Sequence, residues 1–144
     1  MKTVKDLLAE KSATVWSISP KAKVFDALKL MSEKSIGALM VMADKSKVAG
    51  IITERDYARK VILQGRSSES TRVEEIMTAN VVCVSPRAKS RDCMALMSEK
   101  NIRHLPVVDE GRVIGMVSVR DIVTDIIADQ DFTISQLEQY ISGQ

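Results

Sequence analysis

Apolar side chains recur every three or four positions in the first part of the chain, near residues 3 to 11 and again from 23 to 35. This spacing is typical of amphipathic helices that bury one apolar stripe. Residues 14–18, Thr-Val-Trp-Ser-Ile, lie between the two stretches and are rich in β-favouring side chains. We therefore expect a helix, a strand and a second helix in that order.

Two apolar runs follow, over residues 38–42 and 48–52, with the polar turn 44–47 between them. Runs of this length around a polar turn predict a β-hairpin. Thr53 ends the second run and has Asp56 three positions later, which is the spacing of a capping box at a helix start. We expect a helix from Thr53 onwards, and Ser118 with Asp121 repeats the arrangement.

Segments of the first half of the chain return in the same order in the second half. Ser19 to Lys23 returns as Ser85 to Lys89 at an offset of 66, and Gly50 to Asp56 matches Gly115 to Asp121 at an offset of 65. The chain therefore holds two copies of a strand, helix, strand, strand, helix unit. A duplicated unit normally buries its apolar face against its twin, so we expect two clefts between the copies.

Short helices are expected outside the two copies. Polar and small residues over 64–71 lead into a helix at 73–77, and apolar positions from 132 to 141 predict a separate C-terminal helix. The apolar stripe of that last helix needs cover from the domain or from a second subunit. The predicted organisation is an N-terminal helix, first copy, linker, second copy and C-terminal helix, at 1–12, 13–64, 65–78, 79–129 and 130–144.

Composition narrows the class of protein. At 144 residues, with 45% hydrophobic and 28% charged side chains, the chain can bury one sizeable core. A net charge of +2 without a basic block argues against a nucleic-acid partner. No apolar run approaches a membrane span or a signal core, so we expect a cytoplasmic protein without a membrane partner.

The inventory of reactive side chains is small. Cys83 and Cys93 are the two cysteines and the chain has one histidine, so neither a disulfide framework nor a structural zinc site can be built within one chain. We expect two half-buried thiols, with redox pairing across a dimer left open. No Ser-His-Asp set, Cys-His set, P-loop or carboxylate pair is visible, so we expect no catalytic residue and no metal.

The two helix starts are the candidate binding features. An aspartate in the first turn can accept hydrogen bonds from both ribose hydroxyls, a hydroxyl at the cap can reach the sugar or a phosphate, and a helix N-terminus favours an anion. The alternative is that each pair only caps its helix. The candidate residues, with an arginine beside each aspartate as a phosphate contact, are Thr53, Arg55 and Asp56 in the first copy and Ser118, Arg120 and Asp121 in the second.

The element order, the two Gly-apolar-apolar-Thr/Ser-x-x-Asp endings and the segment from Ile102 to Asp109, Ile-Arg-His-Leu-Pro-Val-Val-Asp, together resemble a tandem pair of CBS (cystathionine β-synthase-type) domains over about residues 13–128. The resemblance implies an α+β fold in which two βαββα units pack with pseudo-twofold symmetry. It also implies two clefts for adenosine-containing ligands and a homodimer.

The resemblance places further residues in the clefts. It implies that Arg103 and His104 contact phosphate, whereas their counterparts Gly37 and Ala38 cannot donate through a side chain. The two clefts should then be unequal, with the cleft of Asp56 taking a phosphate-rich ligand through Arg103 and His104 and the other cleft taking a bulkier one. The residues expected to form the slot for adenine are Ala13, Thr14, Val15, Ile51, Ala79, Asn80, Val81 and Met116.

The function implied by the resemblance is a non-catalytic sensor. An adenine nucleotide, with AMP, ADP, ATP and NAD(H) all open, would bind one or both clefts and bias the packing of the units. An unidentified protein partner would then respond in trans. The alternative is a structural dimerisation adaptor with empty clefts.

Overall fold

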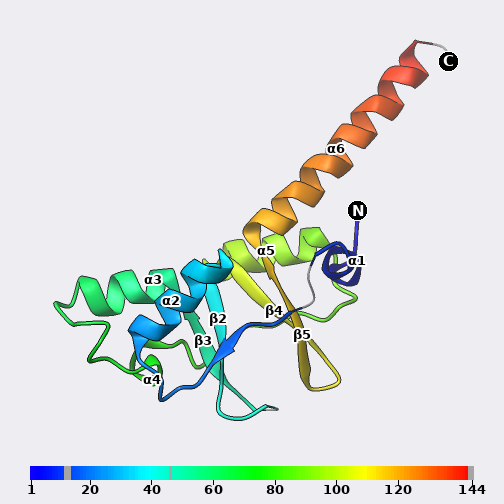
Figure 1. Ribbon diagram of the computed structural model, residues 1–144. Coiled ribbons are helices and arrows are strands. Elements are labelled where there is room, and N and C mark those ends of the chain that lie inside the picture. Colours follow the sequence, from blue (N-terminus) through cyan, green and yellow to red (C-terminus); the bar gives the residue numbers. More distant parts are fainter. Residues whose placement is uncertain (12–13, 46, 143–144) are drawn as a thin grey trace. The chain divides into compact units, whose positions relative to one another are not determined.

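The computed structural model describes residues 1–11, 14–45 and 47–142, and the chain divides into two compact units. Unit 1 comprises residues 1–13 together with 83–144, and unit 2 comprises residues 14–82. Each unit has its own sheet and its own helices, so the fold is of the expected α+β class (Figure 1).

Unit 2 is built on a three-stranded sheet in the order β1-β2-β3, with β1 parallel and β3 antiparallel to the central strand. The predicted hairpin is confirmed. The strand expected over 14–18 is correct only at its end, because only Ser17 and Ile18 pair with β2. The elements are β1 (Ser17–Ile18), α2 (Val24–Lys34), β2 (Ala38–Met42), β3 (Val48–Thr53), α3 (Glu54–Tyr57), a π-helical segment η1 (Ala58–Ile62) and α4 (Val73–Ile76).

The core of unit 2 lies between the sheet and its helices. The stripe that predicted α2 is buried as expected, and it meets apolar side chains from β2, β3, η1 and α4. Burial of this set removes a large apolar area from water, which is the main stabilising contribution to such a unit. The buried residues are Val24, Ala27, Met31, Leu39, Val41, Ile52, Val61, Val73 and Ile76.

Unit 1 has a two-stranded antiparallel sheet and three helices. The first strand of this copy, expected from the repeat, is reduced to a single parallel bridge between Val84 and Val107. The elements are α1 (Val4–Ala9), α5 (Ser90–Lys100), β4 (His104–Asp109), β5 (Arg112–Ser118) and α6 (Val119–Ile141).

Helices α1 and α4 hold equivalent places in the two units. Thr3, just before α1, bridges Lys89, and Arg72, just before α4, bridges Lys23, while Lys23 and Lys89 are equivalent in the repeat. The sequences also correspond at an offset of 69, as Val-Lys-Asp-Leu-Leu from Val4 and Val-Glu-Glu-Ile-Met from Val73. The repeat therefore begins earlier than the sequence analysis placed it.

Each of these leading helices packs in the unit formed by the other copy. Helix α1 precedes the first copy in sequence, yet it belongs to unit 1, where Val4, Leu7 and Leu8 are buried. Helix α4 precedes the second copy and contributes Val73 and Ile76 to the core of unit 2. The two copies thus exchange their first helices.

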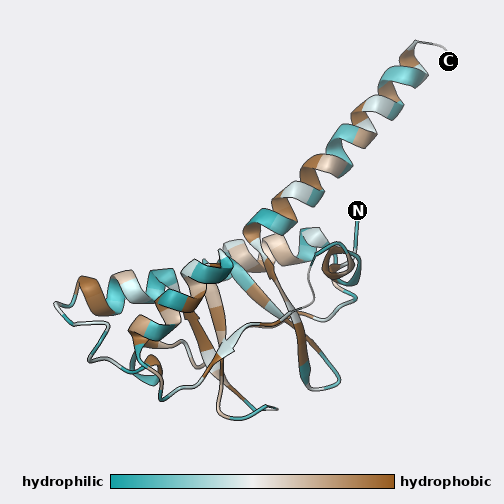
Figure 2. Cartoon of the chain, in the orientation of Figure 1, coloured by the Kyte–Doolittle hydropathy of each residue, from teal (hydrophilic) through white to brown (hydrophobic). Residues whose placement is uncertain are grey.

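The C-terminal segment differs from the prediction of two helices. Residues Val119–Ile141 form one helix, α6, because no glycine or proline interrupts the chain between Ile127 and Phe132. The second half of α6 runs away from the sheet of its own unit (Figure 1), and hydrophobic residues alternate with hydrophilic ones along its length (Figure 2). No helix in the described part of the chain combines the length and apolar character that crossing a bilayer demands.

Candidate ligand sites at two helix starts

In unit 2 the predicted pair Thr53 and Asp56 forms a complete capping box at the start of α3. The Thr53 amide donates to Asp56 Oδ2 at 3.0 Å, and the Asp56 amide donates to Thr53 Oγ1 at 3.1 Å. The capping role that the sequence left as an alternative is therefore present. It engages one carboxylate oxygen, Oδ2, and a carboxylate has a second oxygen with its own lone pairs.

The second oxygen of Asp56 is turned towards a cation and a hydroxyl. Lys60 Nζ lies 3.2 Å from Asp56 Oδ1, and Thr78 Oγ1 donates to the same oxygen at 3.4 Å. Lys60 Nζ also donates to the carbonyl of Ile76 at 2.9 Å. The side chain of Asp56 keeps 12% of its surface exposed.

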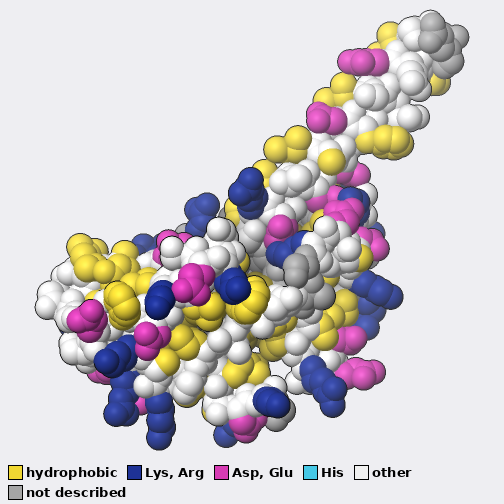
Figure 3. Space-filling view, in the orientation of Figure 1, with side chains coloured by type: hydrophobic (Ala, Val, Ile, Leu, Met, Phe, Trp, Pro, Cys, Tyr) yellow, Lys and Arg dark blue, Asp and Glu magenta, His cyan; other side chains and the backbone are white. Residues whose placement is uncertain are grey.

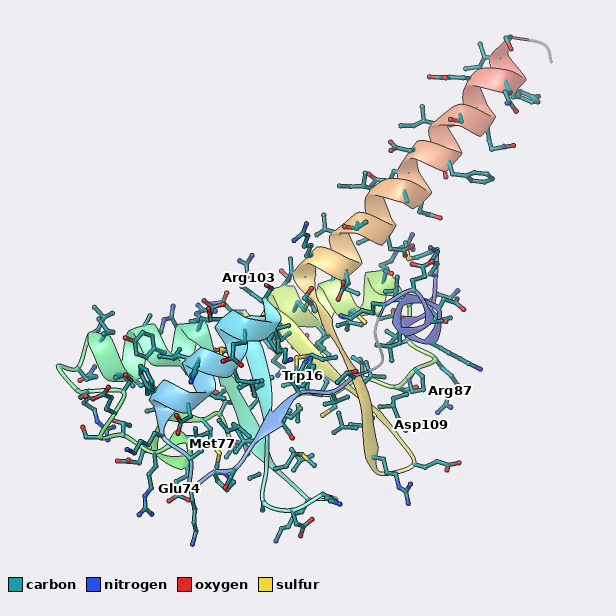
Figure 4. The ribbon with its side chains drawn as sticks, viewed as in Figure 1. Trp16, Glu74, Met77, Arg87, Arg103 and Asp109 are labelled. Carbon is teal, nitrogen blue, oxygen red and sulfur yellow. The ribbon has the colours of Figure 1, made fainter. Side chains whose placement is uncertain are left out.

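The chain that follows α4 is held against β3. Ile51 donates to the Thr78 carbonyl at 3.0 Å, and Thr78 donates back to the Ile51 carbonyl at 2.8 Å. Gly50 permits this approach, because a Cβ at that position would lie 2.6 Å from the Thr78 carbonyl oxygen. Met77, labelled in Figure 4, lies in the same stretch after α4.

This pairing brings several predicted residues of unit 2 together. Ala79, Asn80 and Val81 come directly after the bridge between Ile51 and Thr78, close to the cap of Asp56. Ala38 pairs with Thr53 across the hairpin, and the carbonyl of Gly37 accepts from the amide of Glu54. Thr14, Val15 and Arg55 also belong to unit 2, whereas Ala13 lies outside the described residues.

In unit 1 the pair Ser118 and Asp121 forms the same capping box at the start of α6. The Ser118 amide donates to Asp121 Oδ2 at 2.9 Å, and the Asp121 amide donates to Ser118 Oγ at 3.3 Å. A residue that the sequence analysis did not select completes this site. Lys11 Nζ donates to Asp121 Oδ2 at 2.9 Å and to the carbonyl of Met116 at 2.9 Å.

Lys11 changes the electrostatics of Asp121. Burial acts to raise the pKa of this carboxyl group, but the hydrogen bonds from Lys11 and Ser118 and the charge of Lys11 outweigh it. The net result is a pKa below the ordinary value of 3.8. Asp121 is therefore ionised at neutral pH and can accept hydrogen bonds from a ligand.

His104 lies beside this site in the same unit, since it pairs with Ser118 across the β4–β5 hairpin. Its pKa is lowered below 6.5 by burial and by the charges of Arg103 and Lys11, against the opposing effect of Asp121. The imidazole is therefore neutral at physiological pH. That His104 and Arg103 serve the cleft of Asp56, as the resemblance implies, stays a prediction.

The arginines differ in exposure. Arg103 lies between α5 and β4 and is exposed (Figure 4), as is Arg120 at the start of α6, whereas Arg55 is half-buried. Exposed arginines near a helix start are available to an anionic ligand without loss of internal packing. A phosphate contact by any of the three stays a prediction.

The sequence analysis missed Lys11, Lys60 and Thr78. Lys60 follows Asp56 by four positions, the helical spacing at which side chains meet, so this contact had a local signal. Lys11 and Thr78 lie on the segments that follow α1 and α4. The sequence feature that could have revealed Lys11 and Thr78 is the similarity between α1 and α4, which is weaker than the similarity between the two main copies.

The cysteines also differ from the expectation of two half-buried thiols. Cys93 is fully buried in α5, and burial, with the charge of Asp92 as a second cause, raises its pKa to about 11. Cys83 is exposed. Burial also raises the pKa of the Cys83 thiol, so the two thiols differ chiefly in access.

The chain contains two matches to the CBS domain family, over residues 4–62 and 73–128. It belongs to the CBS domain family. The matches begin at Val4 and Val73, the first residues of α1 and α4, which agrees with the equivalence of those helices. As a CBS pair, the chain has the tandem fold that its repeat predicted.

Similar proteins support the same assignment. The mitochondrial CBS-domain protein CBSX3 of Arabidopsis thaliana is 44% identical over 124 residues, which are 83% of this chain and 60% of that protein. A CBS-domain protein from Burkholderia ambifaria MC40-6, assigned to signal transduction, is 53% identical with a TM-score of 0.85, covering 90% of this chain and 96% of that one. The cytoplasmic location expected from the sequence stays a prediction.

One solved relative contains ligands. The CBS domain pair of protein MJ0100 is 28% identical to this chain with a TM-score of 0.77, and the match covers 90% of this chain and 98% of that one. That pair was crystallised in complex with 5′-methylthioadenosine and S-adenosyl-L-methionine. Both compounds contain a ribose bound to adenine.

Proposed function

We propose that this CBS pair is a non-catalytic regulatory module that binds an adenosine-containing ligand through Asp56 and Asp121. The observation that carries the proposal is the same in both units. A carboxylate at a helix start closes the cap with Oδ2 and has a lysine beside it, Lys60 at Asp56 and Lys11 at Asp121, and the further lone pairs of a carboxylate can accept from ribose hydroxyls. The adenosine compounds bound by the MJ0100 pair support this class of ligand.

The chemistry of the ribose suits such a carboxylate. Two adjacent hydroxyls can both donate to an ionised carboxylate, and hydrogen bonds to a charged group are the stronger kind, worth about 1.5–3 kcal/mol each. The pKa of Asp121 lies below its ordinary value, so the acceptor is charged throughout the physiological range. The cap holds each carboxylate in place before the ligand arrives.

We further propose that the ligand is an adenine nucleotide, AMP, ADP, ATP or NAD(H), whose binding is transmitted to a protein partner. Transmission needs only a ligand affinity that differs between two arrangements of the chain. The relative assigned to signal transduction supports a regulatory role. S-adenosyl-L-methionine belongs in the same test because a relative binds it.

The alternative is a structural dimerisation adaptor, and one observation favours it. The capping boxes give both aspartates a structural task that needs no ligand. Helix α6 meanwhile exposes an apolar stripe that a second subunit could cover. The regulatory module needs Asp56 and Asp121 for ligand binding, whereas the adaptor needs them only for the stability of the helix caps.

A thermal-shift panel separates these functions. Parent protein and the double variant Asp56→Asn/Asp121→Asn would be heated with AMP, ADP, ATP, NAD(H), 5′-methylthioadenosine or S-adenosyl-L-methionine. Asparagine keeps an oxygen for the cap amide but loses the charged second oxygen. A ligand at 100 times its dissociation constant should stabilise the parent by about 2.7 kcal/mol and the variant far less. No shift with any compound would favour the adaptor.

We also propose a homodimer in which a second copy of the chain covers the exposed stripe of α6. Ile127, Ile134 and Ile141 recur every seven residues, and Leu137 lies in the other core position of this heptad pattern. All four are at least half exposed, and apolar side chains lie along the projecting part of α6 in Figure 3. Isoleucine and leucine in these positions favour a pair of parallel helices.

A further inference from the structure

We propose that Lys11 and Arg120 form a phosphate subsite beside Asp121 in unit 1, and that Lys11 makes this site select a nucleotide over the uncharged nucleoside. The inference rests on the proposed function, because it places the ribose of the ligand on Asp121. It adds Lys11 as a specificity-determining residue, which lies on the segment after α1 and outside the repeated Gly-to-Asp motif.

A cavity of about 260 Å³ lies between the α1 segment and the first turns of α6. Its volume is several times the roughly 30 Å³ that one water molecule occupies in the liquid, so a phosphate group fits within it. Asp121, the proposed ribose-binding residue, forms part of its wall. The polar residues that the argument uses are Lys2, Glu10, Lys11, Arg120, Asp121 and Asp125.

The ammonium group of Lys11 is held in place and has donor capacity left. Two of its three N–H groups donate to the Met116 carbonyl and to Asp121 Oδ2, each at 2.9 Å. The third has no acceptor among the described residues, and the side chain is 40% exposed. A phosphate oxygen in the cavity can therefore accept from Lys11 while the other bonds are kept.

The other charged side chains that line the cavity are two cations, Lys2 and Arg120, and two carboxylates, Glu10 and Asp125. Lys2 is paired with Glu10, and Asp125 is turned to the Ser90 hydroxyl at 2.5 Å and the Lys2 amide at 3.2 Å. Arg120 has no ion pair within the described part of the chain. Its guanidinium and the N-terminal end of the 23-residue helix α6 add to the positive potential at Lys11.

A nucleoside and a nucleotide meet this arrangement differently. A ribose that binds Asp121 shares the carboxylate with Lys11, and an uncharged nucleoside offers no acceptor to the third N–H group of the ammonium. A phosphate on the same ligand accepts from that N–H group and adds a charge-assisted hydrogen bond. We expect the parent site to prefer AMP over adenosine by about tenfold or more.

Unit 2 has no lysine at the sequence position equivalent to Lys11; the cation beside Asp56 is instead Lys60, which also donates to a backbone carbonyl, that of Ile76. The correspondence between α1 and α4 places Asn80 where unit 1 has Lys11, and Asp125 of unit 1 corresponds to Lys60 of unit 2. The two sites therefore differ in the position of the lysine beside the aspartate, in addition to the difference at Arg103 and His104. Unit 1 is thus a candidate site for a phosphorylated ligand alongside the site of Asp56, to which the sequence analysis assigned it, because each aspartate has a lysine beside it.

The test is a calorimetric titration of AMP, adenosine and inorganic phosphate into proteins that all carry Asp56→Asn, so that the unit 1 site is measured alone. Lys11→Met removes the ammonium, Lys11→Arg keeps a cation, and Lys5→Met removes the same charge from an exposed position of α1 as the matched control. Lys11→Met should abolish most of the preference for AMP. Lys11→Arg and Lys5→Met should retain it.

Three results would overturn the inference. An unchanged AMP-to-adenosine ratio in Lys11→Met, while Asp121→Asn weakens both ligands, would remove the subsite and leave the proposed function intact. Inorganic phosphate binding as tightly as AMP would show a site for free phosphate. Absence of binding of both adenosine ligands to the parent and to the Asp56→Asn protein would overturn the inference together with the proposed function.

Discussion

At the residue scale, the carboxylate of each aspartate in the repeated motif closes a helix cap and also meets a lysine. In both units Oδ2 accepts from the amide that begins the helix, so the sequence spacing predicted the cap correctly. The neighbours differ, with Lys60 beside Asp56 and Lys11 beside Asp121. Local spacing could reveal Lys60, whereas Lys11 approaches from a distant part of the chain.

The pairing of Lys11 with Asp121 should make part of the stability depend on pH. The pKa of Asp121 is lowered in the native state, so its contribution is present above the unfolded value near 3.8 and is lost as the pH falls through the native value. Lys11→Met should lower the free energy of unfolding at about pH 7, and the difference from the parent should shrink below about pH 3. Urea unfolding of the parent and of Lys11→Met at both pH values measures this difference in the free energy of unfolding.

Lys5→Met serves as the control in that experiment, because Lys5 is exposed on the same helix. His104, which is neutral at about pH 7, and Arg120 lie near Asp121 and are present in every protein compared, so the comparison reports on Lys11. An equal difference between parent and Lys11→Met at both pH values would contradict the ion pair.

The two thiols should react at very different rates. Cys83 is exposed, whereas Cys93 is fully buried and its pKa is raised to about 11. A thiol reagent at about pH 8 should label Cys83 in the native protein and Cys93 only after unfolding, because the thiolate is the reactive form. Mass spectrometry of the labelled peptides measures this, and rapid native labelling of Cys93 would contradict the buried position.

At the element scale, the two glycines of the repeated motif permit close packing against two different segments. A Cβ on Gly50 would lie 2.6 Å from the backbone oxygen of Thr78, whereas a Cβ on Gly115 would meet the end of the Leu8 side chain at 2.6 Å. A side-chain end can move, but a carbonyl held in a bridge to Ile51 cannot do so without loss of hydrogen bonds.

Gly50→Ala should therefore destabilise the protein more than Gly115→Ala. Overpacking of this kind usually lowers the free energy of unfolding by about 1–3 kcal/mol, and we expect Gly50→Ala at the upper end and Gly115→Ala at the lower. Chemical denaturation of both variants measures the two values, each serving as the other's control. The reverse order would contradict the packing of the segment after α4.

The sequence predicted the elements of each copy well, because α2, β2 and β3 follow from local apolar spacing. It did not predict that α1 and α4 exchange between copies, since Val4 and Val73 show only that an apolar face must be buried and not which core buries it. The continuous helix α6 was also missed. A polar stretch such as Ala128 to Asp131 is compatible with both a helix and a loop, because it contains no glycine or proline that would end a helix.

At the scale of the whole molecule, the C-terminal half of α6 is an apolar surface that has no partner within the described chain. Ile134 and Leu137 are each about half exposed, yet a helix that leaves such a stripe in water gains little from folding alone. A second copy supplies an identical stripe without a like charge in the core positions of the seam. The dimer is thus an expected consequence of this helix.

Leu137→Asp should convert the dimer to a monomer, because a charge in the core position of a helix pair is buried without a counter-ion. Ser135→Asp places the same charge on an exposed position of the same helix outside the heptad core and should leave the dimer intact. Sedimentation equilibrium measures the mass of both variants. A dimer that persists in Leu137→Asp would exclude α6 as the interface.

The central claim is that Asp56 and Asp121 bind the ribose of an adenosine ligand, and a thermodynamic cycle tests it most directly. AMP and 2′-deoxy-AMP would be titrated by calorimetry into the parent and into the double variant Asp56→Asn/Asp121→Asn, with thermal unfolding as a check that the variant is folded. In the parent, loss of the 2′-hydroxyl should weaken binding by about 1.5–3 kcal/mol, while the variant should bind both compounds weakly and alike. Equal binding of the two compounds by the parent, or AMP binding by the variant as tight as by the parent, would contradict the claim.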